Sequence, residues 1–167
     1  MSDVIKIKRG LDIPLVGKAE KVFSKVALPE LFAIKPSDFQ GLTPKMVVKP
    51  GDKVKSGTVL FVDKYRPEIK FVSPVSGELK AVNRGERRVI LEVVVESDNK
   101  MEHEDFGKGS VKSMTRESVV EKLLASGAWT YFRQRPYNIL ANPSVTPRAI
   151  FVSTFDSAPL APDYEFI

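Results

Sequence analysis

Turn-forming residues recur so often in the first two-thirds of this 167-residue chain that only short strands fit between them. Runs rich in Val, Ile, Leu and Phe are separated by Gly and Pro, as at Lys49-Pro50-Gly51-Asp52 and Ser73-Pro74. Strands this short, with turns this dense, are typical of a β-sandwich or small barrel rather than of βαβ units. The predicted strands are residues 4–8, 46–48, 58–62, 71–72, 78–82 and 89–96, with another short strand opening at Val54.

A five-residue pattern at residues 48–52 is repeated 34 residues later, at residues 82–86. In both copies a strand ends, a Gly follows and an acidic residue comes next, at Gly51 and Gly85 respectively. We predict that each Gly takes a turn conformation that is unfavourable for bulkier residues. The repeat predicts a β-rich domain over about residues 40–96 with approximate two-fold symmetry.

The hydrophobic period changes to that of a helix after a polar linker at residues 100–109. Thr115 can cap a helix that runs to Ser126, and Gly127 can end it. Residues 149–154 form a continuous apolar run, which is typical of a strand covered on both faces. A helix, an irregular segment and one such strand would open an α/β unit, so we expect this chain to be a fragment of a longer protein.

The composition excludes several kinds of site. Without any Cys, the chain cannot form a disulfide, a Cys-ligated zinc site, an iron–sulfur cluster or a thiol nucleophile. Its single histidine, His103, supplies no metal-binding cluster, and we interpret the acidic residues beside it as a solvated loop. No apolar run approaches the ~20 residues of a membrane-spanning helix, and we expect no secretory signal.

Positive charge is concentrated in the first half of the chain. Residues 1–90 hold 18 Lys and Arg against 10 Asp and Glu, and the net charge of the whole chain is +5. A basic surface can bind an acidic protein partner, an anionic lipid face or nucleic acid. Because no stripe of aromatic and basic residues accompanies the charge, we do not expect nucleic-acid binding.

Residues 46–60 followed by residues 73–79 resemble the biotinyl/lipoyl-carrier family of barrel-sandwich domains. That family places a modifiable lysine, usually flanked by Met, on the hairpin that precedes its Pro-x-x-Gly turn. Here the expected position falls near Arg66-Pro67, and Lys70 lies too close to the turn. The resemblance therefore implies the fold without the attached prosthetic group.

Seven stretches, in order along nearly the whole chain, resemble the A-subunit family of the sodium-translocating NADH:quinone reductases. They are residues 5–17, 51–52, 71–77, 83–85, 126–130, 133–137 and 149–161. The resemblance implies a mainly β fold, with a barrel-sandwich hybrid (biotinyl/lipoyl-like) domain followed by a helix and the start of a Rossmann-like α/β domain. The expected parts are an amino-terminal extension packing on the barrel (1–40), the barrel-sandwich domain (41–98), a linker (99–114) and the truncated Rossmann-like domain (115–167).

The same resemblance implies a soluble, peripheral subunit located at the cytoplasmic face of the bacterial inner membrane, attached only through partner subunits. The complex passes electrons from NADH to ubiquinone or menaquinone and exports sodium. The subunit would contribute to assembly and to quinone interaction, without catalytic residues, cofactor or metal of its own, since NADH, flavins, iron centres and quinone belong to the assembled complex. Two alternatives stay open, namely a non-redox barrel-sandwich adaptor of a transport system and a carrier domain for a covalent cofactor.

Residues 129–137 combine aromatic residues and arginines, which are over-represented at protein interfaces. Exposed, they would contact a partner subunit or a quinone headgroup; the alternative is local packing beneath a loop. A second candidate is the loop after the strand predicted at residues 149–154, because ligands of open α/β sheets bind beyond the carboxyl ends of strands. The candidate contact residues are Trp129, Tyr131, Phe132, Arg133, Arg135, Tyr137, Phe155, Asp156 and Pro159.

Overall fold

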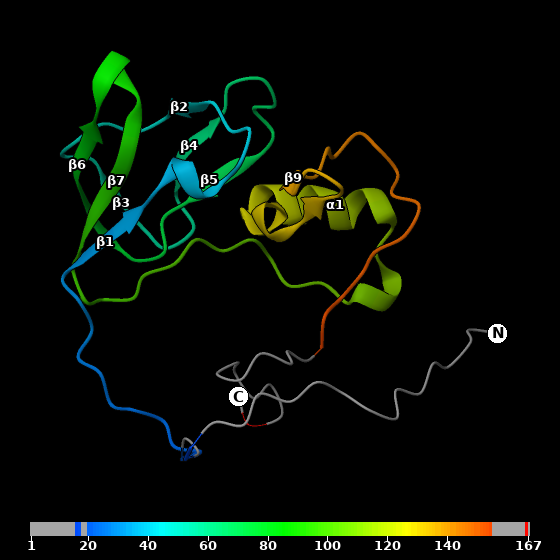
Figure 1. The fold of residues 1–167 in the computed structure, drawn as a ribbon, viewed down its shortest axis with the longest axis horizontal. Helices are drawn as coiled ribbons and strands as arrows, with labels where there is room; N and C mark the ends of the chain where they lie inside the picture. The colour runs from blue at the N-terminus through cyan, green and yellow to red at the C-terminus, as the bar shows by residue number, and fades with distance from the viewer. Residues whose placement is uncertain (1–15, 18–19, 155–165, 167) are drawn as a thin grey trace. The chain divides into compact units, whose positions relative to one another are not determined.

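The computed structural model describes residues 16–17, 20–154 and 166. The chain divides into two units, one made of Met1–Ala27 with Pro147–Ile167 and the other of Leu28–Thr146. In the first unit the rings of Phe23 and Phe166 stack with their centroids 4.9 Å apart. The second unit contains every helix and strand of the described residues, and its elements can be followed in Figure 1.

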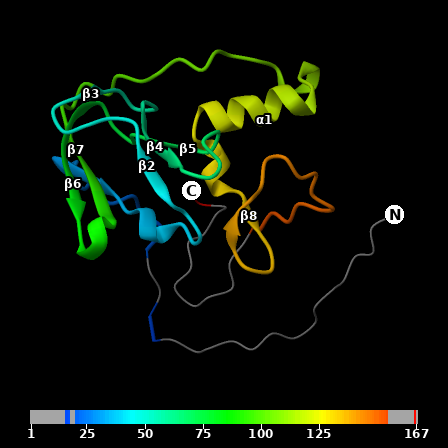
Figure 2. The same ribbon diagram turned by 90° about the horizontal axis from the view of Figure 1, so that it is seen from above.

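Two antiparallel sheets make up the β-rich part of the second unit (Figures 1 and 2). The four-stranded sheet contains, in spatial order, β1 (Leu31–Ile34), β7 (Ile90–Ser97), β6 (Gly77–Arg84) and β3 (Lys53–Val54). The three-stranded sheet contains β2 (Pro44–Met46), β4 (Val59–Asp63) and β5 (Lys70–Val72). Strands β4 to β7 confirm the four strands predicted between residues 58 and 96, whereas the strand predicted at residues 4–8 lies outside the described residues.

Side chains from both sheets form one hydrophobic core. Leu60 and Phe61 of β4 and Leu79 of β6 are fully buried, and so are Val93 and Val95, which alternate along β7 as the two-residue period of a strand requires. Burying a side chain of this size completely contributes about 1.5–3 kcal/mol to stability. The core therefore holds the two sheets against each other.

The predicted repeat is wrong at its second turn. Gly51, in the loop between β2 and β3, has a φ of 94°, whereas Gly85 has a φ of −96°. The left-handed residues here are instead Arg87 and Arg88, which follow the second copy in the turn that joins β6 to β7. The copies differ because Gly85 belongs to a hairpin and donates its N–H to the Val89 carbonyl at 2.8 Å.

The first part of the expected linker lies against the barrel as a strap, defined here as residues 98–106. Ser56 forms a parallel bridge with His103, in which its N–H donates to the Glu102 carbonyl at 2.9 Å and its carbonyl accepts from the Glu104 N–H at 2.8 Å. The strap is therefore bonded to the loop that follows β3.

The predicted helix is confirmed as α1 (Arg116–Ala125). The Thr115 hydroxyl accepts a hydrogen bond from the Ser118 N–H at 3.3 Å, which caps the first turn. Gly127 ends the helix in the left-handed conformation at a φ of 76°. A Cβ added there would lie 2.9 Å from the methyl groups of Val72, so this end of α1 packs tightly against β5.

A short hairpin follows the helix. The 3₁₀ helix Ala128–Tyr131 leads into β8 (Arg133–Gln134), which pairs with β9 (Ile139–Leu140). Trp129 and Leu140 join the same core as the barrel residues, so the region after the strap packs on the barrel. The other 3₁₀ helices of the described residues are Pro36–Asp38, Glu86–Arg88 and Val111–Ser113.

The strand predicted at residues 149–154 is not formed. None of these residues is assigned to a strand, and Ile150, Phe151 and Val152 are exposed. A lone strand leaves its backbone donors and acceptors without partners. The prediction is wrong for this chain because no other described strand pairs with this segment.

Candidate functional site

The structure separates the aromatic and arginine segment into buried and exposed residues. Trp129 is buried, and its indole N–H donates to the Ala141 carbonyl at 2.8 Å. Phe132 is half-buried, with its ring centroid 5.3 Å from that of Trp129. These two candidates therefore pack locally and hold the β8–β9 hairpin on the barrel.

The other four candidates, Tyr131, Arg133, Arg135 and Tyr137, are exposed, and we call them the aromatic–arginine surface. Tyr131 is 86% exposed and Tyr137 is 72% exposed. The guanidinium of Arg133 lies 5.0 Å from the centroid of the Phe39 ring, a distance at which a cation–π attraction orients the side chain. The surface therefore presents two phenol rings and two cations, Tyr131 at the end of the 3₁₀ helix and the other three on the hairpin that follows it.

An ion pair between the buried Asp63, at the end of β4, and the half-buried Arg66 supports the contact between the β4–β5 loop and this hairpin. The Asp63 side chain is 1% exposed, and one of its oxygens accepts a hydrogen bond from Nε of Arg66 at 2.9 Å and lies 2.9 Å from Nη2 of the same arginine. Nη1 of the same arginine donates to the Leu140 carbonyl of β9 at 3.2 Å. Arg66, near which the resemblance to carrier domains places the expected lysine, thus binds the β8–β9 hairpin.

One exposed aromatic residue near this contact was missed by the sequence analysis. Tyr65 precedes Arg66 in the β4–β5 loop and is largely exposed, with Lys64 Nζ 5.8 Å from its ring centroid. It is remote in sequence from the aromatic–arginine surface, so only the tertiary contact between Arg66 and Leu140 associates the two. No periodicity in the sequence signals such a contact.

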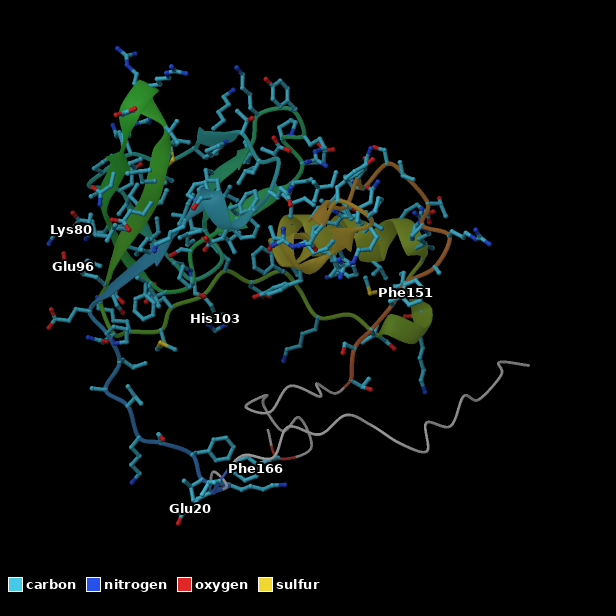
Figure 3. All side chains as sticks on the ribbon, viewed as in Figure 1. Glu20, Lys80, Glu96, His103, Phe151 and Phe166 are labelled. Atoms are coloured by element: carbon cyan, nitrogen blue, oxygen red, sulfur yellow. The ribbon has the colours of Figure 1, made fainter. Side chains whose placement is uncertain are left out.

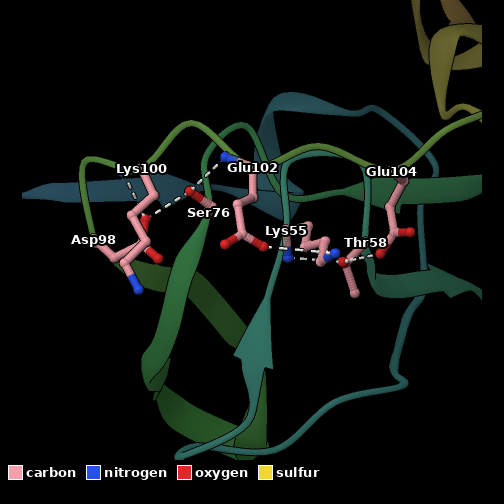
Figure 4. A network of polar contacts seen from close by, with 7 residues as sticks. All are labelled: Lys55, Thr58, Ser76, Asp98, Lys100, Glu102 and Glu104. Atoms are coloured by element: carbon pink, nitrogen blue, oxygen red, sulfur yellow. Dashed lines mark hydrogen bonds and ion pairs between the residues drawn. The ribbon is translucent and has the colours of Figure 1, made fainter.

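A polar network holds the strap to the barrel (Figure 4). The Ser76 hydroxyl donates to Asp98 at 2.6 Å and accepts from the Glu102 N–H at 3.1 Å. The Ser76 hydrogen bond, helped by the Lys100 N–H, lowers the pKa of Asp98 below its ordinary value of 3.8. The ionised Asp98 carboxylate therefore contributes its full stabilisation at pH values above 3.8. This stabilisation is lost as the pH falls through the lowered pKa.

Two more contacts complete the network. Lys55 pairs with Glu102 at 3.5 Å, and the Thr58 hydroxyl donates to Glu104 at 2.8 Å. A cleft of about 680 Å³ runs beside these residues and is lined mainly by charged and polar side chains. The two glutamates on either side of His103 therefore bind barrel residues.

Lys80 and Glu96 form an exposed ion pair between β6 and β7 (Figure 3). The Lys80 ammonium donates to the Glu96 carboxylate at 2.6 Å, and this bond raises the pKa of Lys80 above 10.5. The stabilisation from the Lys80–Glu96 pair is complete at pH values below 10.5 and is lost as the pH rises through the raised pKa of Lys80. The pair has a structural role in the sheet.

Within the described residues, no three His, Cys, Asp or Glu side chains gather in a way that would hold a metal ion. A groove of about 520 Å³ beside α1 is lined in part by Val120 and Leu124. The remaining candidates Phe155, Asp156 and Pro159 lie outside the described residues.

The described part of the chain has no helix with the length and apolar character needed to cross a bilayer.

The comparisons with known proteins identify the family. Residues 5–98 match the model of the NqrA N-terminal barrel-sandwich hybrid domain, and residues 114–167 match the NqrA second alpha/beta domain. These matches confirm the predicted fold class, a barrel-sandwich hybrid followed by the start of an α/β domain.

Curated relatives agree with the family models. The chain is 39% identical over 168 residues to the A-subunit of the Na(+)-translocating NADH-quinone reductase of Serratia proteamaculans, and 41% identical over 162 residues to that of Hahella chejuensis. These alignments cover 98% and 96% of this chain but only 37% and 36% of the relatives. Because the first family model alone matches more than half of this chain, the chain belongs to the NqrA family and carries the barrel-sandwich hybrid domain and the beginning of the second α/β domain.

Proposed function

We propose that this chain is part of an assembly subunit of a sodium-translocating NADH-quinone reductase. Such a complex passes electrons from NADH to ubiquinone or menaquinone and exports sodium. In this proposal the chain supplies contacts to other subunits, which carry the NADH site, the flavins and the iron centres. Those subunits hold it at the cytoplasmic face of the inner membrane. The family assignment supports the complex and argues against a non-redox adaptor.

The observation that carries the assembly role is the aromatic–arginine surface. Tyr131 and Tyr137 expose most of their area. Because Tyr rings cover much surface at low entropic cost and are common at the centres of interfaces, these two side chains suit a surface that binds a partner. The backbone that carries these two rings is held by two hydrogen bonds, from the Trp129 indole to the Ala141 carbonyl and from Arg66 to the Leu140 carbonyl. A surface held in place before binding loses little conformational freedom when a partner covers it.

Quinone contact is the less supported of the two proposed roles. Aromatic faces offer a quinone ring a favourable stacking partner, and Trp129 and Phe132 already pack against each other. Among the candidate contact residues that the structure describes, quinone contact would therefore depend on Tyr131 and Tyr137. We propose it only as a secondary role, shared with Phe155, Asp156 and Pro159.

The assembly role predicts that changes in this surface release the protein from the complex. In the full-length protein, Tyr131→Ala combined with Arg135→Glu and Tyr137→Ala should reduce the amount that co-purifies with the reductase about tenfold or more. These side chains are exposed, so the thermal unfolding midpoint of the isolated protein should stay the same. Quantitative mass spectrometry of the purified complex measures the ratio of subunits.

A matched control changes exposed residues elsewhere on the chain. Lys108→Glu combined with Lys112→Ala also alters charge, at exposed positions outside the aromatic–arginine surface, and should leave the ratio unchanged. If the triple variant is retained in the complex as well as the unaltered protein, this surface has no role in assembly.

A further inference from the structure

Two consecutive arginines occupy left-handed backbone conformations in the turn between β6 and β7. The Val89 N–H donates to the Glu86 carbonyl at 3.1 Å, and the two residues between them, Arg87 and Arg88, have φ values of 53° and 61°. Positive φ at both central positions is the pattern of a type I′ turn, which strongly favours Asn-Gly. Arginine at these positions is strained, because its Cβ crowds the backbone.

Neighbouring residues hold the strained turn in place. Nη1 of Arg84 donates to the Arg88 carbonyl at 3.0 Å, and the Gly85 N–H donates to the Val89 carbonyl at 2.8 Å. The side chains of Arg87 and Arg88 are exposed, and no carboxylate of the described residues forms an ion pair with either. Strained residues are concentrated at functional sites, where the strain is maintained because the residue serves a purpose.

Apolar side chains lie next to these cations. Val89 is 57% exposed and Leu91 is 51% exposed, although Ile90 between them is buried. A Cβ added to Gly85 would lie 3.2 Å from the Leu91 side chain, so Leu91 covers the turn. The turn lies at the free end of the β6–β7 hairpin, away from α1 (Figure 1). It therefore offers cationic and apolar groups together.

We propose that this turn, through Arg87, Arg88, Val89 and Leu91, docks on a carboxylate-bearing protein surface of another subunit. The proposal rests on the assembly role proposed above and adds a second contact at a different place. Guanidinium groups bind carboxylates through paired hydrogen bonds. The side chains of Val89 and Leu91 would enter a depression between the carboxylates of the partner. The excess of positive charge in residues 1–90 favours approach to an acidic surface.

An acidic protein fits this turn better than an anionic membrane. Glu86 lies directly before the two arginines and would be repelled by a uniformly anionic surface. Membrane-surface segments usually combine several cations with Trp or Phe, and the turn contains neither aromatic residue. The fixed backbone of the turn also suits a partner with a defined arrangement of carboxylates.

The test measures how the full-length protein reassociates with reductase from which it has been removed. Arg87→Glu combined with Arg88→Glu should weaken this association about tenfold or more at low salt, because it places like charges against each other. The difference should shrink at high salt, since screening weakens exposed charge interactions. Lys108→Glu combined with Lys112→Glu introduces the same charge change elsewhere and should have no such effect.

A second variant identifies the partner group. Arg88→Lys keeps the charge and provides an amine. A carbodiimide can couple this amine to an adjacent carboxylate as an amide, and the carbodiimide itself takes up the released water and becomes a urea. In the reassembled complex this variant should give a cross-link from residue 88 to an Asp or Glu of another subunit. A cross-link formed instead to an Asp or Glu much later in the same chain would mean that those residues cover the turn, and would overturn the proposal.

The remaining outcomes separate this inference from the proposed function. If the unaltered protein fails to reassociate at all, the assembly role fails and this inference with it. If the double glutamate variant reassociates with unchanged affinity, only the inference fails. It also fails if that variant loses binding to phosphatidylglycerol vesicles but keeps its affinity for the reductase, because the turn would then bind lipid.

Discussion

Replacing Gly77 by alanine is expected to lower the free energy of unfolding by roughly 3 kcal/mol or more. Gly77 has a φ of 152°, which residues with a side chain rarely adopt. It pairs with Val54 of β3 on one side and with Ser97 of β7 on the other, so its backbone is fixed between two strands. An added Cβ would overlap the carbonyl group of Glu96, which belongs to the sheet and cannot move aside. Urea unfolding of the purified chain measures the loss.

Gly51→Ala is the control for the effect of backbone conformation alone. Gly51 also has a positive φ, at 94°, but a Cβ added there would meet no atom within 4 Å. Its substitution should therefore cost only the strain of the left-handed conformation, about 1 kcal/mol. Equal losses in the two variants would contradict the conclusion that the close approach to Glu96 requires glycine at position 77.

Replacing Arg66 by methionine should destabilise the chain by about 3 kcal/mol, because it leaves the Asp63 carboxylate buried without its cation. That carboxylate is 1% exposed, and it accepts a hydrogen bond from Nε of Arg66 and forms an ion pair with the same guanidinium. The same substitution removes the donor to the Leu140 carbonyl, so the β8–β9 hairpin should also lose protection in amide hydrogen exchange. Thermal unfolding and hydrogen exchange of the same sample measure both effects.

Two further variants show whether the buried charge is the cause. Asp63→Leu combined with Arg66→Met leaves no charge buried and should recover much of the lost stability. Lys80→Met breaks the exposed pair with Glu96 and should have little effect, because exposed pairs contribute little. An Arg66→Met variant no less stable than Lys80→Met would mean that the Asp63–Arg66 pair is not a buried anchor.

Structure that depends on local signals could be predicted from the sequence. The capping residue Thr115 and the terminating Gly127 act within a few residues of α1, and both ends of that helix are where the sequence places them. Strands β4 to β7 follow from β-branched runs between turn residues. The fold class then followed from the number and shortness of these strands together with the family resemblance.

Structure that depends on tertiary partners could not be predicted. The strap was expected to be a solvated linker, and it is bound to the barrel through Ser56 and Ser76, which lie far from it in the sequence. Residues 149–154 have the composition of a buried strand, but a strand also needs neighbours to pair with. The predicted repeat is wrong at Gly85 because a similar pattern of residues forms a hairpin there, in which the glycine has a different backbone conformation from Gly51.

The candidate site was only partly predictable for the same reason. Aromatic and arginine content identified residues 129–137, yet composition cannot tell which side chains face the core. The Trp129 side chain is buried and its indole N–H is bonded to the Ala141 carbonyl, whereas the Tyr131 side chain is exposed. Tyr65 was missed because its association with this region depends on the contact between Arg66 and Leu140.

Hydroxyl-radical footprinting of Tyr131 and Tyr137 tests the assembly role most directly. Both side chains should be oxidised readily in the isolated full-length protein, because they are 86% and 72% exposed here. In the assembled reductase both should be protected about tenfold or more, since residues at the centre of an interface are shielded from water. Equal oxidation in the isolated protein and in the complex, or protection already present in the isolated protein, would contradict the proposal that another subunit covers this surface.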